Sequence, residues 1–165
     1  NTLLGGSFGS RITKNIREDK GYTYSPFSTI NSGYRSAFWY EQADVTTEFT
    51  GASLNEIAKE INTLRTTPPS QEELKGVQNF SAGIFVLQNS SPQGIINQLN
   101  FIDLHGLDDS FLTERVRNIY ALTPEKIQSI ADRYLKYEDM TLVLVGDKKV
   151  LEKQMKEHNE YLKKR

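Results

Sequence analysis

The sequence predicts an α+β fold in which helices pack on one face of a mostly antiparallel sheet. Three features lead to this prediction: two aromatic-rich runs separated by a turn signal, a long block of segments with helical spacing, and one apolar run near the C-terminus. The strands do not alternate with helices, so a doubly wound parallel sheet is not expected. The chain has 165 residues and no dividing linker, so we expect one domain over residues 1–165.

The first segments are expected to be helical. Residues 1–4 are typical of the last turn of a helix, which Gly5 and Gly6 would end. Ser10 is a suitable N-cap for the next helix, and Gly21 is expected to end it.

A hairpin is expected to follow this helix. Residues 22–31 and 36–45 are rich in aromatic and β-branched side chains, and residues 31–33 form a turn signal between them. Residues 46–49 are either a short third strand or the entry to the next helix.

Helices are expected to fill the middle of the chain. Ser70 with Glu73 forms a capping box, and Ser91 and Thr123 each precede a proline at the first helical position. Apolar side chains at helical spacing give each helix one inward face, represented by Ile57, Phe80, Leu99, Val116 and Ile127.

The C-terminal region predicts one more strand and a helix. Residues 141–145 form a continuous apolar run that Gly146 and Asp147 end, which is typical of a buried strand. A charged amphipathic helix is expected from Val150 onward. The last strand would have to return to the sheet that the hairpin begins.

Composition excludes several classes of function. The net charge of −1 gives no field that would attract nucleic acid or an anionic membrane. The chain has no cysteine, so thiolate metal sites and disulfides are excluded. No apolar run approaches the roughly 20 residues that a membrane helix needs.

Metal and phosphate sites are also not expected on this chain. The two histidines, His105 and His158, have no second histidine at helical spacing, and both are interpreted as surface or capping residues. The glycine-rich residues 5–10 lack the preceding strand and the following Gly-Lys-Ser/Thr of a phosphate-binding loop. The paired carboxylates Glu18 and Asp19 are interpreted as a solvated charged face.

Arg17 and Tyr24 are the candidate functional pair. Arginine offers a permanently charged fork of donors, and tyrosine offers a hydroxyl on a rigid ring. If Arg17 ends a helix and Tyr24 lies on the following strand, both can point into one cleft. There they could stabilise the oxyanion that forms when water attacks a peptide carbonyl. The alternative is a structural ion pair for Arg17 and a core or surface position for Tyr24.

The two ends of the chain resemble a known family. Residues 1–12, 16–24, 122–127, 131–135 and 140–147 resemble the C-terminal, non-zinc domain of the pitrilysin/insulinase-type zinc metallopeptidases. That family includes mitochondrial processing peptidase and bacterial relatives. The helical middle of the chain is compatible with the resemblance.

The resemblance implies a clamshell of two homologous α+β halves, on one chain or two, in which the other half carries zinc. It implies that Arg17 and Tyr24, with six residues between them, bind the substrate carbonyl opposite the zinc. It also implies that Gly21, Tyr22 and Phe8 contact the substrate. Tyr22 is the alternative phenol, and the spacing favours Tyr24.

The resemblance further implies that the chain lacks the first strand and most of the first helix of this domain. We expect no cofactor here, Zn²⁺ on the partner domain, and no activity from this chain alone. The expected partners are a peptide or protein substrate, bound as an added strand, and the zinc-binding half. No nucleic acid and no membrane span are expected. A bacterial periplasmic or cytoplasmic location follows from the resemblance only.

Two other functions stay open. The chain could be an inactive structural or assembly subunit, as are some core subunits of respiratory complexes with this fold. It could also be a peptide-binding module without a catalytic partner. An inverted His-x-x-Glu-His motif, on the complete chain or on a partner, would distinguish the peptidase from both.

Overall fold

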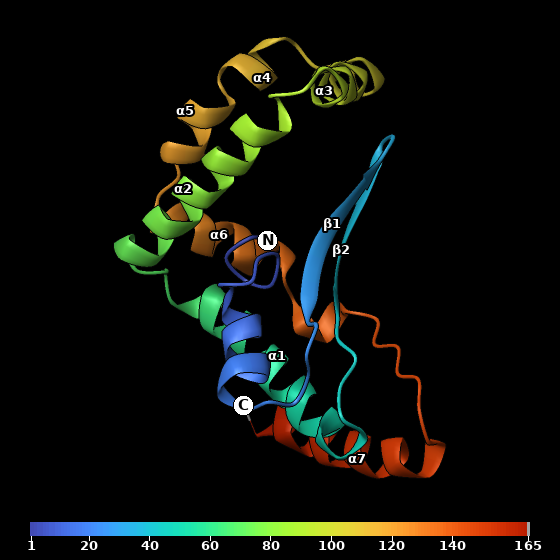
Figure 1. The fold of residues 1–165 in the computed structure, drawn as a ribbon. Helices are drawn as coiled ribbons and strands as arrows, with labels where there is room; N and C mark the ends of the chain where they lie inside the picture. Colours follow the sequence, from blue (N-terminus) through green and yellow to red (C-terminus); the bar gives the residue numbers. More distant parts are fainter. Residues whose placement is uncertain (165) are drawn as a thin grey trace.

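The computed structural model describes residues 1–164 and confirms the α+β class (Figure 1). A short helical segment and a hairpin precede a block of helices, as the sequence predicts. The elements are η1 (Thr13–Asp19), β1 (Phe27–Gly33), β2 (Ser36–Gln42), η2 (Thr47–Phe49), α1 (Thr50–Thr66), α2 (Gln71–Gln88), α3 (Pro92–His105), α4 (Ser110–Thr113), α5 (Arg115–Tyr120), α6 (Pro124–Tyr134), η3 (Tyr137–Asp139) and α7 (Lys148–Lys163). Within residues 1–164, no helix has the length and apolar character needed to cross a bilayer.

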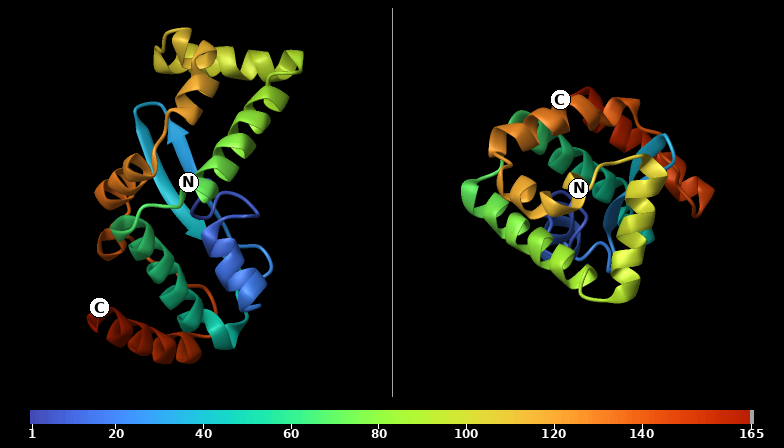
Figure 2. Two further views of the ribbon diagram at one scale, coloured as in Figure 1. Left: turned by 90° about the vertical axis from the view of Figure 1, so that its left-hand side faces the viewer. Right: turned by 90° about the horizontal axis from the view of Figure 1, so that it is seen from above.

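The core lies between the N-terminal segment and helix α1. Helix α1 packs against α6 and α7, and the helices and hairpin surround the N-terminal segment when viewed from above (Figure 2). Ile12 and Ile16 are one helical turn apart, so both face inward, and neither is exposed to solvent. The buried cluster consists of Leu3, Leu4, Ile12, Ile16, Ile61, Leu64 and Ala131.

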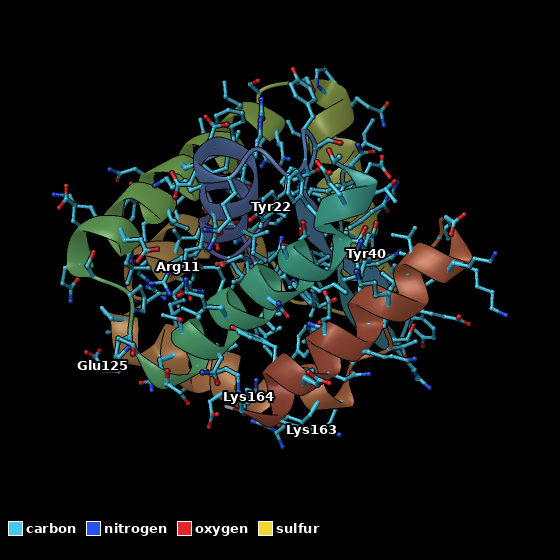
Figure 3. The ribbon with its side chains drawn as sticks, turned by 90° about the horizontal axis from the view of Figure 1, so that it is seen from below. Arg11, Tyr22, Tyr40, Glu125, Lys163 and Lys164 are labelled. Atoms are coloured by element: carbon cyan, nitrogen blue, oxygen red, sulfur yellow. The ribbon has the colours of Figure 1, made fainter. Side chains whose placement is uncertain are left out.

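Three predicted helix starts are confirmed by side-chain caps. The hydroxyls of Ser70, Ser91 and Thr123 each accept a hydrogen bond from a backbone N–H three residues later. The Glu73 carboxylate of this capping box binds Arg11, and both Arg11 and the Ser70 backbone N–H lower its pKa. Figure 3 labels Arg11, whose bidentate ion pair joins the N-terminal segment to α2.

Two boundaries in the C-terminal half differ slightly from the prediction. The short helix expected around Val116 is divided into α4 and α5 at Glu114. Helix α7 begins at Lys148, two residues before Val150, because the Asp147 carboxylate accepts hydrogen bonds from the first free N–H groups.

The hairpin is confirmed, but its turn was predicted at the wrong place. The register pairs Phe27 with Gln42 and Gly33 with Ser36, so the turn consists of Tyr34 and Arg35 rather than residues 31–33. Arg35, the second residue of the turn, takes a left-handed conformation with φ of 58°, and Tyr34, the first, does not.

The strands are also shorter than predicted. Strand β1 begins at Phe27, because Pro26 has no N–H to donate to a ladder. Before it, Thr23 forms only an isolated bridge with Val45. Tyr24 therefore lies on an irregular segment rather than on a strand. Residues 47–49 form a 3₁₀ turn into α1, which confirms the second of the two alternatives for this stretch.

The prediction of a buried strand at residues 141–145 was wrong. Within residues 1–164, the sheet has two strands, and this segment pairs with neither. Val143 and Val145 are 76% and 96% exposed. An apolar run forms a strand only where neighbouring backbone groups are available, and the hairpin edge does not lie beside it.

His158 is buried, so its interpretation as a surface or capping residue was wrong. Its Nδ1 lies 2.6 Å from Asn55 Oδ1, and its Nε2 lies 3.0 Å from the Tyr137 hydroxyl. An amide oxygen only accepts, so Nδ1–H donates to Asn55 and the Tyr137 hydroxyl donates to Nε2. Burial lowers the pKa of His158 and raises the pKa of Tyr137 to about 12. The neutral imidazole therefore joins α7 to α1 and η3.

Replacing His158 by leucine is expected to lower the free energy of unfolding by about 2 to 4 kcal/mol at pH 7, since Asn55 and Tyr137 would lose their buried partner. The folded-state pKa lies below the reference value of 6.5, so the stabilising contribution of neutral His158 is present above pH 6.5 and lost at lower pH. Urea unfolding across this range checks both effects. An unchanged pH dependence in His158→Leu would contradict the assignment.

Candidate functional site

The way helix η1 ends determines where Arg17 and Tyr24 lie. Gly21 has φ of +65°, which favours glycine, and its N–H donates to the Arg17 carbonyl at 3.1 Å. The Tyr22 N–H donates to the Ile16 carbonyl at 2.8 Å. These two bonds end the helix and reverse the chain. Arg17 is thus in the last turn of the helix, and Tyr24 follows three residues after the glycine.

The structure brings Arg17, Tyr24 and Phe8 together. The guanidinium carbon of Arg17 lies over the Phe8 ring, 4.4 Å from its centroid, and over the Tyr24 ring, 4.6 Å from its centroid. A cation over an aromatic face is attracted by the ring quadrupole. The Nε of Arg17 also lies 3.2 Å from the Glu18 carboxylate. Arg17 therefore makes an ion pair, as the structural alternative expected, and in addition is flanked by two rings.

Hydrogen bonds hold the loop that carries Phe8. The Asn1 carbonyl accepts from three successive N–H groups, which forms a single turn at residues 1–6. The Ser7 hydroxyl donates to the Thr2 carbonyl at 3.0 Å, and the Ser10 hydroxyl donates to that of Thr13 at 3.0 Å. The Phe8 ring itself is 65% exposed, so the loop is held by its neighbours rather than by burial of Phe8.

Tyr22 and Tyr24 have different environments. The Tyr22 ring stacks on Phe49, with centroids 4.6 Å apart, and packs against the buried cluster. Figure 3 labels Tyr22 in the interior of the view, between the N-terminal segment and α1. Tyr24 is 80% exposed. The Tyr24 side chain is therefore the more accessible of the two to an external ligand, since Tyr22 is half-buried.

A depression of about 550 Å³ contains most of the predicted site. It is lined by Arg17, Glu18, Gly21, Tyr22, Thr23, Tyr24, Asp44 and Thr46. Phe8 lies at Arg17 but does not line the depression. Asp44 and Thr46 flank Val45, which forms the isolated β-bridge with Thr23.

No metal centre accompanies this site. Among residues 1–164, no group of three or more His, Asp or Glu side chains is arranged to hold a metal ion. His105 lies at the end of α3, where its ring contacts Phe101 at 4.4 Å between centroids.

A larger, apolar trough lies elsewhere, and sequence reasoning missed it. Its volume is about 1130 Å³, and it separates the outer half of the hairpin from α2 and α6. Ile30 and Phe38 line it from the hairpin, and Phe80, Ile84 and Ile130 line it from the helices. The trough excludes Arg17 and Tyr24. Only knowledge of the tertiary arrangement could have found it, because its walls are far apart in sequence.

Glu41 is a second feature that was not foreseen. Both of its carboxyl oxygens are buried without a hydrogen-bond partner among residues 1–164, and burial raises its pKa to about 8. The carboxyl group packs against Gly5, where an added Cβ would lie 2.6 Å from the Ser28 hydroxyl. Strand alternation offered a signal, since Glu41 shares a face with Trp39.

The N-terminal half of the chain matches a known family. Residues 1–80 match the sequence model described as the peptidase M16 inactive domain. The expected family is confirmed. A crystal structure of the peptidase M16 inactive domain from Pseudomonas fluorescens has 25% sequence identity and a TM-score of 0.73, over 82% of this chain and 32% of that one. Residues 1–80 therefore resemble an M16 inactive domain in sequence, and the chain is similar in fold to a solved M16 inactive domain.

Two curated relatives match most of this chain. The "Uncharacterized zinc protease YmxG" of Bacillus subtilis is 28% identical over 153 residues, which is 88% of this chain and 36% of the relative. The "Non-peptidase homolog YmxG" of Helicobacter pylori is 27% identical over 149 residues, or 89% of this chain and 34% of the relative. The chain thus spans about a third of the length of each. Zinc and proteolysis are supported at the level of the family.

Replacing Gly21 by alanine is expected to lower the free energy of unfolding of this domain by about 1 to 2 kcal/mol. No atom lies within 4 Å of the added Cβ, so the cost is that of the left-handed backbone alone. Gly76→Ala, in the middle of α2 and equally open, is the matched control and is expected to stabilise by about 0.5 to 1 kcal/mol. Urea unfolding measures both. Equal effects of the two substitutions would contradict the proposed role of Gly21.

Replacing Glu41 by glutamine is expected to remove a pH dependence of stability. The folded-state pKa, about 8, lies above the reference value of 4.5, so the stabilising contribution of protonated Glu41 is full below pH 4.5 and is lost as the pH rises through 8. The expected change is roughly 3 to 5 kcal/mol. Unfolding at pH 5 and pH 8 measures it, with exposed Glu48→Gln as control. The same pH dependence in Glu41→Gln and in the unmodified chain would refute the assignment.

Proposed function

We propose that this domain is the substrate-binding, non-zinc half of a zinc metalloendopeptidase. In this role it holds an extended peptide and polarises the scissile carbonyl opposite a zinc site on a homologous half. That half is on the same chain or is a separate subunit. The cluster of Arg17 with the exposed Tyr24 is the observation that carries the proposal.

The chemistry of the pair suits a developing oxyanion. Arginine stays protonated at every physiological pH, and its donors lie in the plane of the guanidinium. Arg17 lines the depression, and its recorded ion pair is made through Nε, to Glu18, so the proposal assigns its Nη atoms to the acceptor. The exposed hydroxyl of Tyr24 adds a second donor beside them. Donors fixed in advance stabilise the transition state without reorganising during the reaction.

The peptide backbone would be held along a sheet edge. Each strand of the hairpin pairs only with the other among residues 1–164, so β1 and β2 each have one outer edge. At Ser28 the edge of β1 is already occupied, because its N–H donates to the Gly5 carbonyl and its carbonyl accepts from Asn1. Adding a substrate strand satisfies these N–H and C=O groups and makes little demand on sequence. The irregular backbone at residues 22–26 continues β1 directly to Tyr24.

The zinc would come from the partner half, because no described group on this chain fits a metal ion. When bound there, zinc would supply an activated water at neutral pH. The contribution of this chain would be to orient the carbonyl and to bind the negative charge on its oxygen.

A second function has a specific observation in its favour. One relative carries the name "Non-peptidase homolog", so this sequence family includes proteins described as lacking peptidase activity. In that case the domain would be an inactive structural or assembly subunit, or a peptide-binding module. The trough of about 1130 Å³ would then be the principal binding surface rather than Arg17 and Tyr24.

Replacing Arg17 by alanine, or Tyr24 by phenylalanine, is expected to lower kcat for peptide hydrolysis by about 10- to 1000-fold, because each change removes one oxyanion donor. The assay uses the chain together with its zinc-binding half. Zinc content, measured in parallel, is expected to stay unchanged.

Matched controls keep this test specific. Arg117→Ala and Tyr34→Phe change exposed residues on α5 and at the hairpin turn, outside the site, and should leave kcat unchanged. Unaltered hydrolysis by Arg17→Ala would overturn the assigned role. If the assembled protein binds peptides but hydrolyses none at full zinc occupancy, the non-peptidase alternative is correct.

A further inference from the structure

The Phe8 ring is mostly exposed, so burial of the ring does not hold it in its position. Its ring is 65% exposed, yet it contacts the guanidinium of Arg17 at 4.4 Å. Four other contacts of this kind involve an arginine, and among residues 1–164 only Arg17 has two rings. The loop from Ser7 to Ser10 is held by several hydrogen bonds that do not involve the ring.

We propose that Phe8 is a positioning residue that fixes the plane of the Arg17 guanidinium for the carbonyl oxygen of a bound peptide. This inference rests on the proposed function and deepens it. Phe8 acts through Arg17 and does not itself touch the reacting atoms, which narrows the substrate-contact role that the sequence suggested.

Geometry supports this role. The guanidinium carbon of Arg17 lies 4.4 Å and 4.6 Å from the two ring centroids, and the donors of the group lie in its plane. Glu18 contacts the edge of the group at Nε, and a peptide carbonyl would approach at the Nη atoms. A peptide carbonyl approaching in this plane meets donors that are already oriented. Without Phe8, the long arginine side chain would regain rotamers that point elsewhere, and a smaller fraction of molecules would have it in place.

The loop at residues 7–10 can keep Phe8 against Arg17 because hydrogen bonds hold the loop at both ends. The Ser7 carbonyl accepts from the Ser10 N–H at 3.1 Å and from the Thr13 hydroxyl at 3.3 Å, which ties the loop to the start of η1. Arg17 lies in the last turn of that same segment. Phe8 and Arg17 are therefore held by one rigid element, and Tyr24 approaches from the other side of the Gly21 turn.

The test compares side chains that differ only in their aromatic face. Phe8→Leu keeps an apolar side chain of similar size without a π-face, and Phe8→Tyr and Phe8→Trp retain the face. In the assembled protein we expect Phe8→Leu to lower kcat about 2- to 5-fold with KM little changed. Phe8→Tyr and Phe8→Trp should stay within about twofold of the unmodified protein. Phe111→Leu, which removes the ring beside Arg115, is the matched control and should have no effect.

A spectroscopic readout separates this inference from the proposed function. With ¹⁵N-labelled arginine, the side-chain protons of Arg17 should be shifted upfield by the rings, and Phe8→Leu should reduce that shift while Phe8→Trp preserves it. This holds in the absence of any peptide hydrolysis, so an inactive protein with the expected shifts would refute only the peptidase function.

Two results would overturn the inference. Phe8→Leu with unchanged kcat and unchanged Arg17 shifts would show that Phe8 does not position the cation. A rise in KM that depends on the apolar side chain of the peptide, with kcat unchanged, would show instead that Phe8 contacts the substrate directly.

Discussion

The site depends on the burial of one helical face. Ile12 and Ile16 have no exposed surface, and each such side chain contributes about 1.5 to 3 kcal/mol on burial. Their packing against α1 fixes the rotation of η1 about its axis. Arg17, the next residue after Ile16, is thereby directed to the edge of the core, where its side chain is 23% exposed. Gly21 then reverses the chain, and Tyr24 returns to the same cation.

Within residues 22–24, one tyrosine packs into the core and the other belongs to the proposed site. The Tyr22 ring faces inward onto Phe49, and Tyr24, two residues later, faces solvent. The π-type winding of η1 is a feature that recurs at functional positions in helices, and here the Lys20 N–H reaches back to the Asn15 carbonyl. The exposed rings of Phe8 and Tyr24 contribute little apolar burial, but their faces can support the charged guanidinium of Arg17. Neighbouring residues supply the stability that these two do not.

The sequence was most informative where structure is determined locally. The caps at Ser70, Ser91 and Thr123, and the glycine at position 21, predicted helix ends correctly because each depends on a few adjacent backbone groups. The spacing of Arg17 and Tyr24 predicted their proximity. The strand at residues 141–145 failed because strand formation depends on partners that are remote in sequence. His158 and Glu41 were missed for a similar reason, since burial of a polar side chain is set by tertiary packing.

We propose that Arg17 and Tyr24 together bind the carbonyl of an extended peptide, and this binding can be observed. It is tested most directly by a crystal structure of this domain, together with its zinc-binding half, in complex with a non-hydrolysable peptide analogue. We expect one backbone carbonyl oxygen within about 3 Å of both an Arg17 Nη atom and the Tyr24 hydroxyl, with the Phe8 ring still over the guanidinium. A peptide bound in the apolar trough between the hairpin and α2, with Arg17 contacting only its present neighbours, would contradict it.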